Sequence, residues 1–270
     1  VSESLRVLKH RVGQQHMAQS TRLYLDQALE TGLVIRLDGD EAQYLGRVLR
    51  LRAGDRISVF NGRDGEYAAE LQVFTRKHVE LVVDSRLVDP EDAGSESELR
   101  LHLVQGVARG ERMDIVIQKT TELGIKRITP VLTQYSAVRL DAARAARRRD
   151  HWERIAINAA EQCGRLKPPL IDPVSDLNEW LGANLGREDV TQLVLDPVAS
   201  NAFADAAPPG TKLCLLVGPE GGLADSEIDD ARLAGFSGVN LGPRVLRTET
   251  AAIAAVTLAQ FRFGDMRGDG

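Results

Sequence analysis

Short strands dominate the hydrophobic pattern of the first third of the chain. Segments with alternating or β-branched apolar residues recur between Gly, Asp and Asn residues, which is typical of strands joined by turns. Five segments have this pattern: residues 21–25, 33–37, 56–60, 67–74 and 78–83. Residues 40–50 instead place apolar side chains at helical spacing and predict one helix. The pattern predicts a small β-barrel domain over residues 20–89.

The pattern changes after residues 90–98, a polar and acidic stretch with Pro and Gly that is typical of a linker. From there strand patterns alternate with helical patterns. Strands are expected at residues 99–107, 128–132, 192–195, 213–217 and 238–241, and helices at residues 111–123, 141–163, 176–185, 226–234 and 249–261. Alternation of this kind predicts a parallel sheet covered by helices on both faces. The expected fold class is therefore α/β over residues 99–265, preceded by the small β-barrel.

Composition excludes several classes of protein. The 270 residues are 43% hydrophobic and 27% charged, and no apolar run approaches the roughly eighteen residues of a membrane helix. Cys163 and Cys214 lack the spacing of a zinc site, and the five histidines lack the spacing of metal ligands. We therefore expect a cytoplasmic protein with no metal and no membrane partner. Residues 1–19 lack the apolar segment of a secretory signal and are expected to be a disordered extension, with Met17 as a candidate start.

Basic residues cluster in two places, although the formal net charge is −5. Residues 44–56 carry four arginines against one aspartate, and residues 139–167 carry eight cations against four acids. Such clusters can neutralise the phosphates of a nucleic acid. For residues 144–149 the alternative is the solvated face of a helix, and charge alone leaves both interpretations open.

Two glycine-containing corners follow predicted strands. One is the run "GPEGG" at residues 218–222, and the other is the segment 241–250. In open α/β sheets ligands bind beyond the carboxyl ends of the strands, and glycine lets a ligand approach the backbone. A plain tight turn explains either corner alone equally well. The chain has neither a phosphate-loop motif nor a G-x-G-x-x-G motif after a strand, which excludes these two kinds of nucleotide site.

Five ordered blocks of sequence carry a specific resemblance. They are "YLGRVLRLRAGDRISVFNG" at 44–62, "RGERMDIVIQKTTELGIKRITPV" at 109–131, "HWERIAINAAEQCGRLKPP" at 151–169, "LLVGPEGGLADSEI" at 215–228 and "LGPRVLRTETAAIAAV" at 241–256. Together they resemble the RsmE family, the bacterial 16S ribosomal RNA uridine-N3 methyltransferases of the SPOUT, or trefoil-knot, superfamily. The similarity extends over nearly all of residues 21–263.

The resemblance implies a PUA-like N-terminal β-barrel that helps to hold RNA. It also implies a C-terminal knotted α/β domain that binds S-adenosylmethionine and forms a homodimer. Three loops at strand ends would hold the cofactor. By similarity the cofactor-binding residues are Leu195, Asp196, Pro197, Val217, Gly218, Pro219, Glu220, Gly221, Gly222, Leu241, Gly242, Val245, Leu246, Arg247 and Thr248. Glu220 would either meet the ribose hydroxyls or brace its own loop.

Two residues are candidates for the chemistry of methyl transfer. Uridine N3 must lose its proton as the methyl group arrives, so the protein must orient the base and balance charge. Arg247 is the candidate that stabilises negative charge on the uracil, and Glu249 the candidate that orients Arg247 or accepts the proton. The alternative for Glu249 is a capping role at the start of the last helix.

The candidates for RNA contacts lie in both domains. They are Arg22, Arg47, Arg50, Arg52, Arg109, Arg112, Lys119, Gln162 and Arg165. For Lys119 the alternative is an exposed helix pair with Glu122. The family commonly has Ser or Thr where this chain has Ala224, so Asp225 or Ser226 is expected to cap the helix that follows.

The expected activity is methylation of N3 of a specific uridine in 16S ribosomal RNA, with S-adenosylmethionine as the methyl donor. The substrate would be free RNA or the assembled small ribosomal subunit. One alternative keeps the fold and methylates a ribose 2′-hydroxyl of RNA, and the barrel together with the 109–123 block argues against it. Another is a non-catalytic RNA-binding factor for ribosome assembly, which has no need to retain both cofactor corners.

Overall fold

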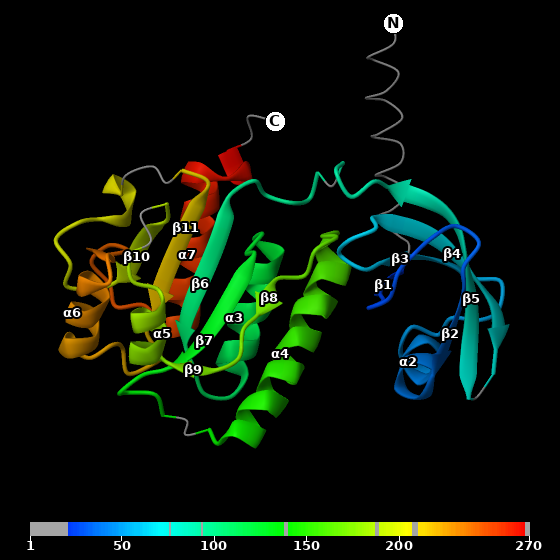
Figure 1. Cartoon of the computed structure of the whole chain (residues 1–270), viewed down its shortest axis with the longest axis horizontal. Coiled ribbons are helices and arrows are strands. Elements are labelled where there is room, and N and C mark those ends of the chain that lie inside the picture. The colour runs from blue at the N-terminus through cyan, green and yellow to red at the C-terminus, as the bar shows by residue number, and fades with distance from the viewer. Residues whose placement is uncertain are drawn as a thin grey trace, which may run out of the picture. The chain divides into compact units, whose positions relative to one another are not determined.

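The computed structural model describes residues 21–75, 77–92, 94–137, 140–186, 189–206 and 210–267, and the chain divides into two compact units between Ala93 and Gly94. The N-terminal extension predicted at residues 1–19 lies outside the described residues. Each unit has its own buried apolar core. The two units are described separately below (Figure 1).

The N-terminal unit is built on a five-stranded sheet in the order β1-β3-β4-β5-β2. Its strands are β1 (Arg22–Tyr24), β2 (Val34–Asp38), β3 (Arg56–Phe60), β4 (Glu66–Phe74) and β5 (His78–Val88). β1 runs parallel to β3, and the other ladders are antiparallel. Among the described residues no ladder joins β1 to β2, so the predicted barrel is a curled sheet that remains open between these strands.

The helix predicted at residues 40–50 is shorter and changes type. α2 (Gly39–Gln43) passes directly into a π-helical turn, η1 (Tyr44–Val48). A Cβ on Gly46 would lie 2.8 Å from the Phe74 ring, so glycine lets this turn lie close to β4. Arg50 then takes a left-handed conformation, with φ of 58°, which helical residues do not adopt. The predicted single helix was therefore wrong in its length and type.

The C-terminal unit contains the parallel sheet that the alternation of strands and helices predicts. The order is β12-β10-β11-β6-β7-β8, with β9 also beside β7, and every ladder is parallel. The strands are β6 (Arg100–Gly106), β7 (Arg127–Leu132), β8 (Leu170–Ile171), β9 (Ser175–Asp176), β10 (Thr191–Leu195), β11 (Lys212–Val217) and β12 (Ser237–Val239). β8 and β9 have two residues each, too few to produce a periodic pattern. β12 ends at Val239 because Asn240 pairs with Ala202 instead.

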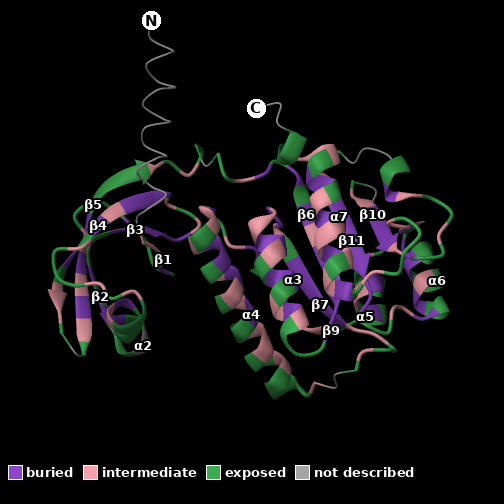
Figure 2. Ribbon diagram, turned by 180° about the vertical axis from the view of Figure 1, so that it is seen from behind, coloured by how far each residue is buried: buried purple, intermediate pink, exposed green. Residues whose placement is uncertain are grey.

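Helices cover both faces of this sheet, which confirms the α/β class (Figure 2). α3 (Glu111–Glu122), α4 (Ala142–Cys163) and α7 (Thr248–Phe263) pack on one face, while α5 (Leu177–Ala183) and α6 (Asp225–Leu233) pack on the other. Within β11, Leu213 and Leu215 join the first core and Cys214 and Leu216 the second, as strand alternation requires. Two short 3₁₀ turns, η2 (Phe203–Asp205) and η3 (Asp265–Arg267), complete the unit.

The segment after β12 crosses from one side of the sheet to the other. α6 lies on the face opposite α7, and β12 connects them at the sheet edge. α7 nevertheless packs beneath β11 and β6, so the chain must pass beyond the end of β10 to reach it. Thr248, the first residue of α7, donates from Oγ1 to the Gly218 carbonyl at 2.6 Å and fixes the crossing at the end of β11.

α6 begins with an unusual cap. Ala224 occupies the N-cap position with extended backbone angles, so the expectation that Asp225 or Ser226 caps this helix was wrong. Glu227 supplies the missing contact because its Oε2 accepts the Ala224 N–H at 2.8 Å. Its Oε1 accepts the Gln134 N–H at 2.7 Å, which joins the start of α6 to the loop after β7. A buried carboxylate thus holds this turn without an N-cap hydroxyl.

Candidate functional site

Three loops meet at one edge of the C-terminal sheet. β12, β10 and β11 are parallel neighbours, so the segments that follow Val239, Leu195 and Val217 all leave the same edge. Asp196 ties the first segment to the strand beside it, because its N–H donates to the Val239 carbonyl at 3.0 Å. Its buried carboxylate also accepts the N–H of Val198 at 3.0 Å. The order of the strands therefore brings the predicted cofactor loops together.

The corner at residues 218–222 is a tight turn in which glycine is required. The Gly222 N–H donates to the Pro219 carbonyl at 2.9 Å, and Gly222 has a φ of 74°. A Cβ on Gly218 would lie 2.8 Å from the Gly222 carbonyl carbon and 3.0 Å from the Leu223 nitrogen. Both are backbone atoms, so a side chain at Gly218 would open the turn.

Two other glycines let neighbouring segments approach this corner. A Cβ on Gly106, at the end of β6, would lie 2.4 Å from Pro219 Cδ. A Cβ on Gly221 would lie 2.7 Å from Tyr135 Cβ, in the loop after β7. The corner is thus enclosed by the ends of β6 and β7 as well as by its own strand.

Glu220 braces the corner against the segment before α3. Its Oε1 accepts the Arg109 N–H at 2.9 Å and an Arg112 Nη1 hydrogen at 2.6 Å. Burial alone raises the pKa of this carboxyl group, but the backbone donors and the Arg112 guanidinium outweigh it and hold the pKa below its ordinary value. These contacts favour the bracing role over contact with a ribose.

Arg112 lies between two carboxylates. Its Nη1 reaches Glu220, and its Nε lies 3.9 Å from Oε1 of Glu249. The second carboxylate oxygen of Glu249, Oε2, is buried and accepts no hydrogen bond from the residues that the structure describes. Arg247 occupies the N-cap of α7, so the alternative that Glu249 caps this helix was wrong. Glu249 therefore presents an unpartnered oxygen beside the corner.

Sequence reasoning missed Gln105, which supports the corner through a hydrogen bond to Thr248. Gln105 Nε2 donates to Thr248 Oγ1 at 2.9 Å, and Thr248 in turn donates to the Gly218 carbonyl. Gln105 is fully buried, and its Oε1 finds no partner among the described residues. A polar residue just before a glycine, at the end of an apolar strand, was the signal in the sequence.

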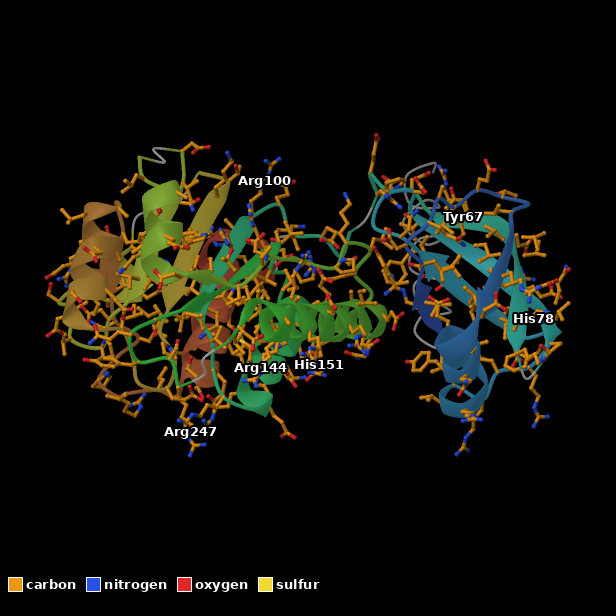
Figure 3. The ribbon with its side chains drawn as sticks, turned by 60° about the horizontal axis from the view of Figure 1, so that its bottom comes forward. Tyr67, His78, Arg100, Arg144, His151 and Arg247 are labelled. Carbon is orange, nitrogen blue, oxygen red and sulfur yellow. The ribbon has the colours of Figure 1, made fainter. Side chains whose placement is uncertain are left out.

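The predicted cofactor residues lie on these loops or at the ends of the adjoining elements, where Leu195 ends β10, Val217 ends β11 and Thr248 begins α7, and they differ in exposure. Asp196, Val217, Gly218, Pro219 and Thr248 are buried; Leu195, Gly222, Leu241 and Leu246 are partly buried; and Pro197, Glu220, Gly221, Gly242, Val245 and Arg247 are exposed. Figure 3 shows the Arg247 side chain projecting from the ribbon. No ion pair involves Arg247 within the described part of the chain.

Two of the predicted RNA contacts are corrected by their burial. The side chain of Arg22 is 7% exposed, pairs with the buried Glu66 at 3.0 Å and lies over the Phe60 ring. The side chain of Arg165 is 3% exposed and is engaged by Glu96. Neither guanidinium can reach RNA in the folded protein, because both are enclosed by protein atoms.

The remaining predicted RNA contacts are accessible in the folded units. Arg47, Arg50, Arg52, Arg109 and Gln162 are exposed, and Arg112 and Lys119 are partly exposed. Lys119 Nζ lies 2.8 Å from Glu122 Oε1, as the helix-pair alternative requires. Among the described residues no group of His, Cys, Asp or Glu side chains could hold a metal ion. The helices described include none that is long and apolar enough to span a membrane.

Comparison with protein families matches both units. A model described as an RNA methyltransferase domain matches residues 95–260, and one described as an RNA methyltransferase PUA domain matches residues 37–84. Ribosomal RNA small subunit methyltransferase E of Buchnera aphidicola is 32% identical over 91% of this chain and 97% of its own length. The protein of the same name from Bacillus subtilis is 30% identical over 90% of this chain and 96% of its own.

Solved structures agree with these relatives. The ribosomal RNA small subunit methyltransferase E of Neisseria gonorrhoeae, bound to S-adenosylmethionine, superposes with a TM-score of 0.82 at 34% identity, covering 92% of this chain and 99% of that one. A methyltransferase of Legionella pneumophila in complex with the same cofactor gives a TM-score of 0.84 at 36% identity, with the same coverage. This chain belongs to the ribosomal RNA small subunit methyltransferase E family.

Proposed function

We propose that this protein transfers a methyl group from S-adenosylmethionine to N3 of a uridine in 16S ribosomal RNA. The observation that carries the proposal is the convergence of three strand-end loops on a glycine corner, beside the unpartnered Oε2 of Glu249. Relatives that are 34% and 36% identical were crystallised with this cofactor, which supports the choice of methyl donor. The two alternatives, ribose 2′-O-methylation and a non-catalytic assembly factor, are not favoured by the family to which the chain belongs.

The residues of the three loops fit the cofactor. At Gly222 and Gly242, φ is 74° and 96°, and the space that a Cβ would occupy is open. The backbone of the second and third loops is therefore accessible to an adenosine group, with Asp196 and Leu241 on the loops beside it. When bound, S-adenosylmethionine supplies an electrophilic methyl group.

The protein's own residues orient the base and manage its proton. N3 lies on the Watson–Crick edge, so the uridine must be unpaired or flipped out before it can react. The Glu249 carboxylate, whose side chain is 15% exposed, accepts the N3 proton, and Arg112 Nε lies 3.9 Å from its Oε1 and holds it in place. The exposed Arg247 stabilises the negative charge that develops on the uracil.

Replacing Glu249 by glutamine is expected to lower kcat about 100-fold, because the amide cannot accept the proton. The affinity for S-adenosylmethionine is expected to stay within twofold of wild type, since Glu249 follows the third loop and acts on the base. Single-turnover methylation and calorimetry measure the two quantities. The control is Glu122→Gln, which removes a carboxylate from a partly exposed ion pair on α3. Equal rates for the two variants would exclude Glu249 as the proton acceptor.

The proposed reaction is tested with labelled S-adenosylmethionine and small ribosomal subunits that lack the modification. Nucleoside mass spectrometry should find the label in 3-methyluridine. Label in 2′-O-methyl nucleosides, or no transfer despite tight RNA binding, would overturn the proposal. A parallel reaction with protein-free 16S RNA shows whether the free RNA or the assembled subunit is the substrate.

We also propose that the protein acts in the cytoplasm as a homodimer formed through the C-terminal unit. On α7, Leu258 and Phe261 expose 37% and 58% of their surface, which gives this helix an apolar patch that a second copy could cover. Sedimentation equilibrium at micromolar concentration should give twice the mass of one chain. A single-chain mass under these conditions would contradict the dimer.

A further inference from the structure

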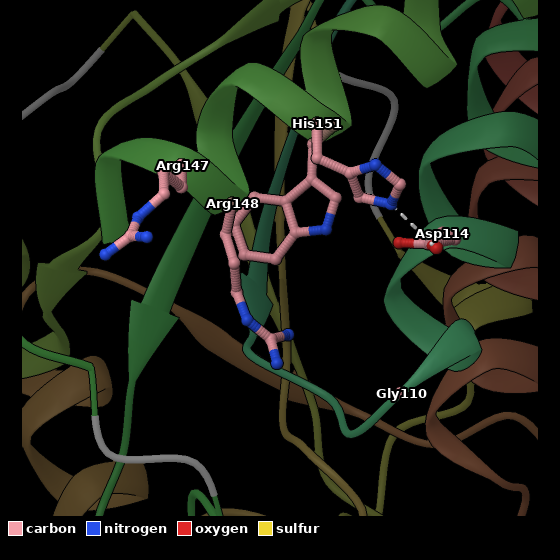
Figure 4. A pocket seen from close by; sticks show the side chains of 6 residues that line it. Gly110, Asp114, Arg147, Arg148 and His151 are labelled. Carbon is pink, nitrogen blue, oxygen red and sulfur yellow. Dashed lines mark hydrogen bonds and ion pairs between the residues drawn. The ribbon is translucent and has the colours of Figure 1, made fainter. Parts of the chain in front are cut away.

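A pocket lies beside the proposed cofactor corner, between the start of α3 and the N-terminal half of α4. Its volume is about 300 Å³, and it is lined by Gly110, Asp114, Arg147, Arg148, His151 and Trp152. Trp152 is buried in the core, so it forms a rigid wall. Figure 4 shows Arg148 and His151 on the side of α4 that faces Gly110 and Asp114.

The two arginines of the pocket lack the acidic partners that their neighbours have. On the same helix, Arg149 pairs with Glu153 at 2.8 Å, and Arg144 pairs with Asp141 at 3.4 Å. Arg147 donates only to the Ala143 carbonyl, at 3.3 Å, and no ion pair involves Arg148 in the described ranges. Two guanidinium groups are therefore left for a ligand of opposite charge.

The acidic group of the pocket is already engaged. His151 Nε2 lies 3.0 Å from Asp114 Oδ2, so a hydrogen bond draws this carboxylate toward the imidazole (Figure 4). The two arginines carry two positive charges against the one negative charge of Asp114. The balance favours a group that carries a single negative charge.

The backbone at Gly110 adds donors on the opposite wall. Gly110 is the N-cap of α3, with φ of 56° and ψ of −137°, and offers no side chain to cap the helix. The Arg112 N–H donates to the Arg109 carbonyl at 3.3 Å, and Gly110 gives the other first-turn N–H groups of α3 no side-chain cap. The adjacent residue, Arg109, donates its N–H to Glu220, so one peptide separates this pocket from the cofactor corner.

We propose that this pocket binds a backbone phosphate of the RNA strand that carries the target uridine. The proposal rests on the proposed function. When the target base enters the corner, the phosphates that flank it in the RNA must pass the residues of the neighbouring pocket. Arginine suits this role because its planar fork can donate two hydrogen bonds to one phosphodiester. The pocket then fixes the position of the strand while the corner receives the base.

The test compares two variants of α4. R147Q/R148Q removes both pocket guanidinium groups, and R154Q removes one from the same helix outside the pocket. Arg154 is a matched control for Arg147, because it is also exposed and its Nε also donates to the carbonyl four residues earlier. Binding to unmodified small ribosomal subunits is measured over a range of salt concentrations, together with the KM for subunits and the affinity for S-adenosylmethionine.

We expect R147Q/R148Q to raise the KM for subunits about 10-fold with kcat unchanged. The logarithm of its binding constant for subunits, plotted against the logarithm of the salt concentration, should have a slope that is less steep by about 0.7 for each phosphate that the variant no longer binds. R154Q should stay within twofold of wild type, and calorimetry should give the same cofactor affinity for all three proteins. Equal KM and equal salt slopes for R147Q/R148Q and R154Q would overturn the proposal.

Two further outcomes test the pocket by itself. If the wild-type protein binds subunits without methylating a uridine, the proposed function fails, and the salt slopes still decide the role of the pocket. Inorganic phosphate is titrated against the wild type and R147Q/R148Q. Saturable phosphate binding that the double variant loses, with RNA binding unchanged, would mark a small-anion site and overturn the proposal.

Discussion

Replacing Gly218 by alanine is expected to abolish detectable binding of S-adenosylmethionine while the protein remains folded. The added Cβ would lie 2.8 Å from the Gly222 carbonyl carbon and 3.0 Å from the Leu223 nitrogen. Since both are backbone atoms, the turn must open, and the second cofactor loop must move away from the other two. Displacement of the reacting groups by about an ångström lowers the rate roughly 100-fold, and the loss of affinity for S-adenosylmethionine lowers kcat/KM further. We therefore expect kcat/KM to fall about 1000-fold or more.

The control is an alanine at a glycine whose surroundings are open. Gly182 lies in α5, and a Cβ there would meet nothing within 4 Å. Gly182→Ala should keep full cofactor affinity and gain about 0.5–1 kcal/mol of stability, because alanine is the better helix former. Gly218→Ala should lose about 1–3 kcal/mol, the usual cost of an overpacked site. Calorimetry gives the affinities and urea unfolding the stabilities. Normal cofactor binding by Gly218→Ala would show that the site lies elsewhere.

The parallel sheet could be predicted because its evidence is local. The strands β7, β10 and β11 end in short apolar runs followed by Gly or a polar residue, and alternation with helices implies parallel ladders. That the three predicted loops meet followed from the same reasoning, since the carboxyl ends of parallel neighbours share one edge. The crossing from β12 to α7 had no local signal, and only the resemblance to a known family indicated it.

The errors arose where a side chain finds its partner far along the chain. Arg22 and Arg165 are of the residue type that commonly contacts RNA, but both are enclosed by the core. Arg22 pairs with a carboxylate 44 residues away, and Arg165 pairs with one 69 residues away. The sequence alone does not show whether an arginine faces solvent or pairs with a buried glutamate. Ala224 shows the same limit, because the carboxylate that supports its helix also binds the Gln134 N–H from another loop.

The second large effect is expected at Glu96, which holds the start of the C-terminal unit. Its carboxylate accepts hydrogen bonds from Arg165 Nη2 at 3.0 Å, from Lys126 Nζ at 2.7 Å and from the Lys167 N–H at 2.9 Å. The side chains of Glu96 and Arg165 are only 9% and 3% exposed. Glu96→Gln leaves the Arg165 guanidinium charged and buried without a counterion. We expect a loss of about 3–5 kcal/mol in the free energy of unfolding.

The matched control is Glu98→Gln, an exposed glutamate two residues away, which should change stability by less than about 0.5 kcal/mol. A second variant, E96Q/R165M, should recover part of the loss because no unpaired charge remains buried. It cannot recover all of it, since Arg165 also donates to the carbonyls of Thr121 and Ile125, at 2.9 and 2.8 Å. Urea unfolding of wild type, E96Q, R165M and E96Q/R165M gives the coupling energy, with Glu98→Gln measured beside them. Equal stabilities for Glu96→Gln and Glu98→Gln would show that the pair contributes nothing.

The same carboxylate should make stability depend on pH. Burial alone raises the pKa of Glu96, but its bonds to Arg165, Lys126 and the Lys167 N–H outweigh this effect and hold the pKa below its ordinary value of 4.5. Because the folded pKa is the lower one, the unfolded chain binds the proton first as the pH falls. The stabilisation is therefore complete above the ordinary pKa and is lost as the pH falls through the folded value. The free energy of unfolding, measured from pH 7 to pH 3, should fall less steeply for Glu96→Gln than for wild type. Equal slopes for the two proteins would show that Glu96 does not cause the pH dependence.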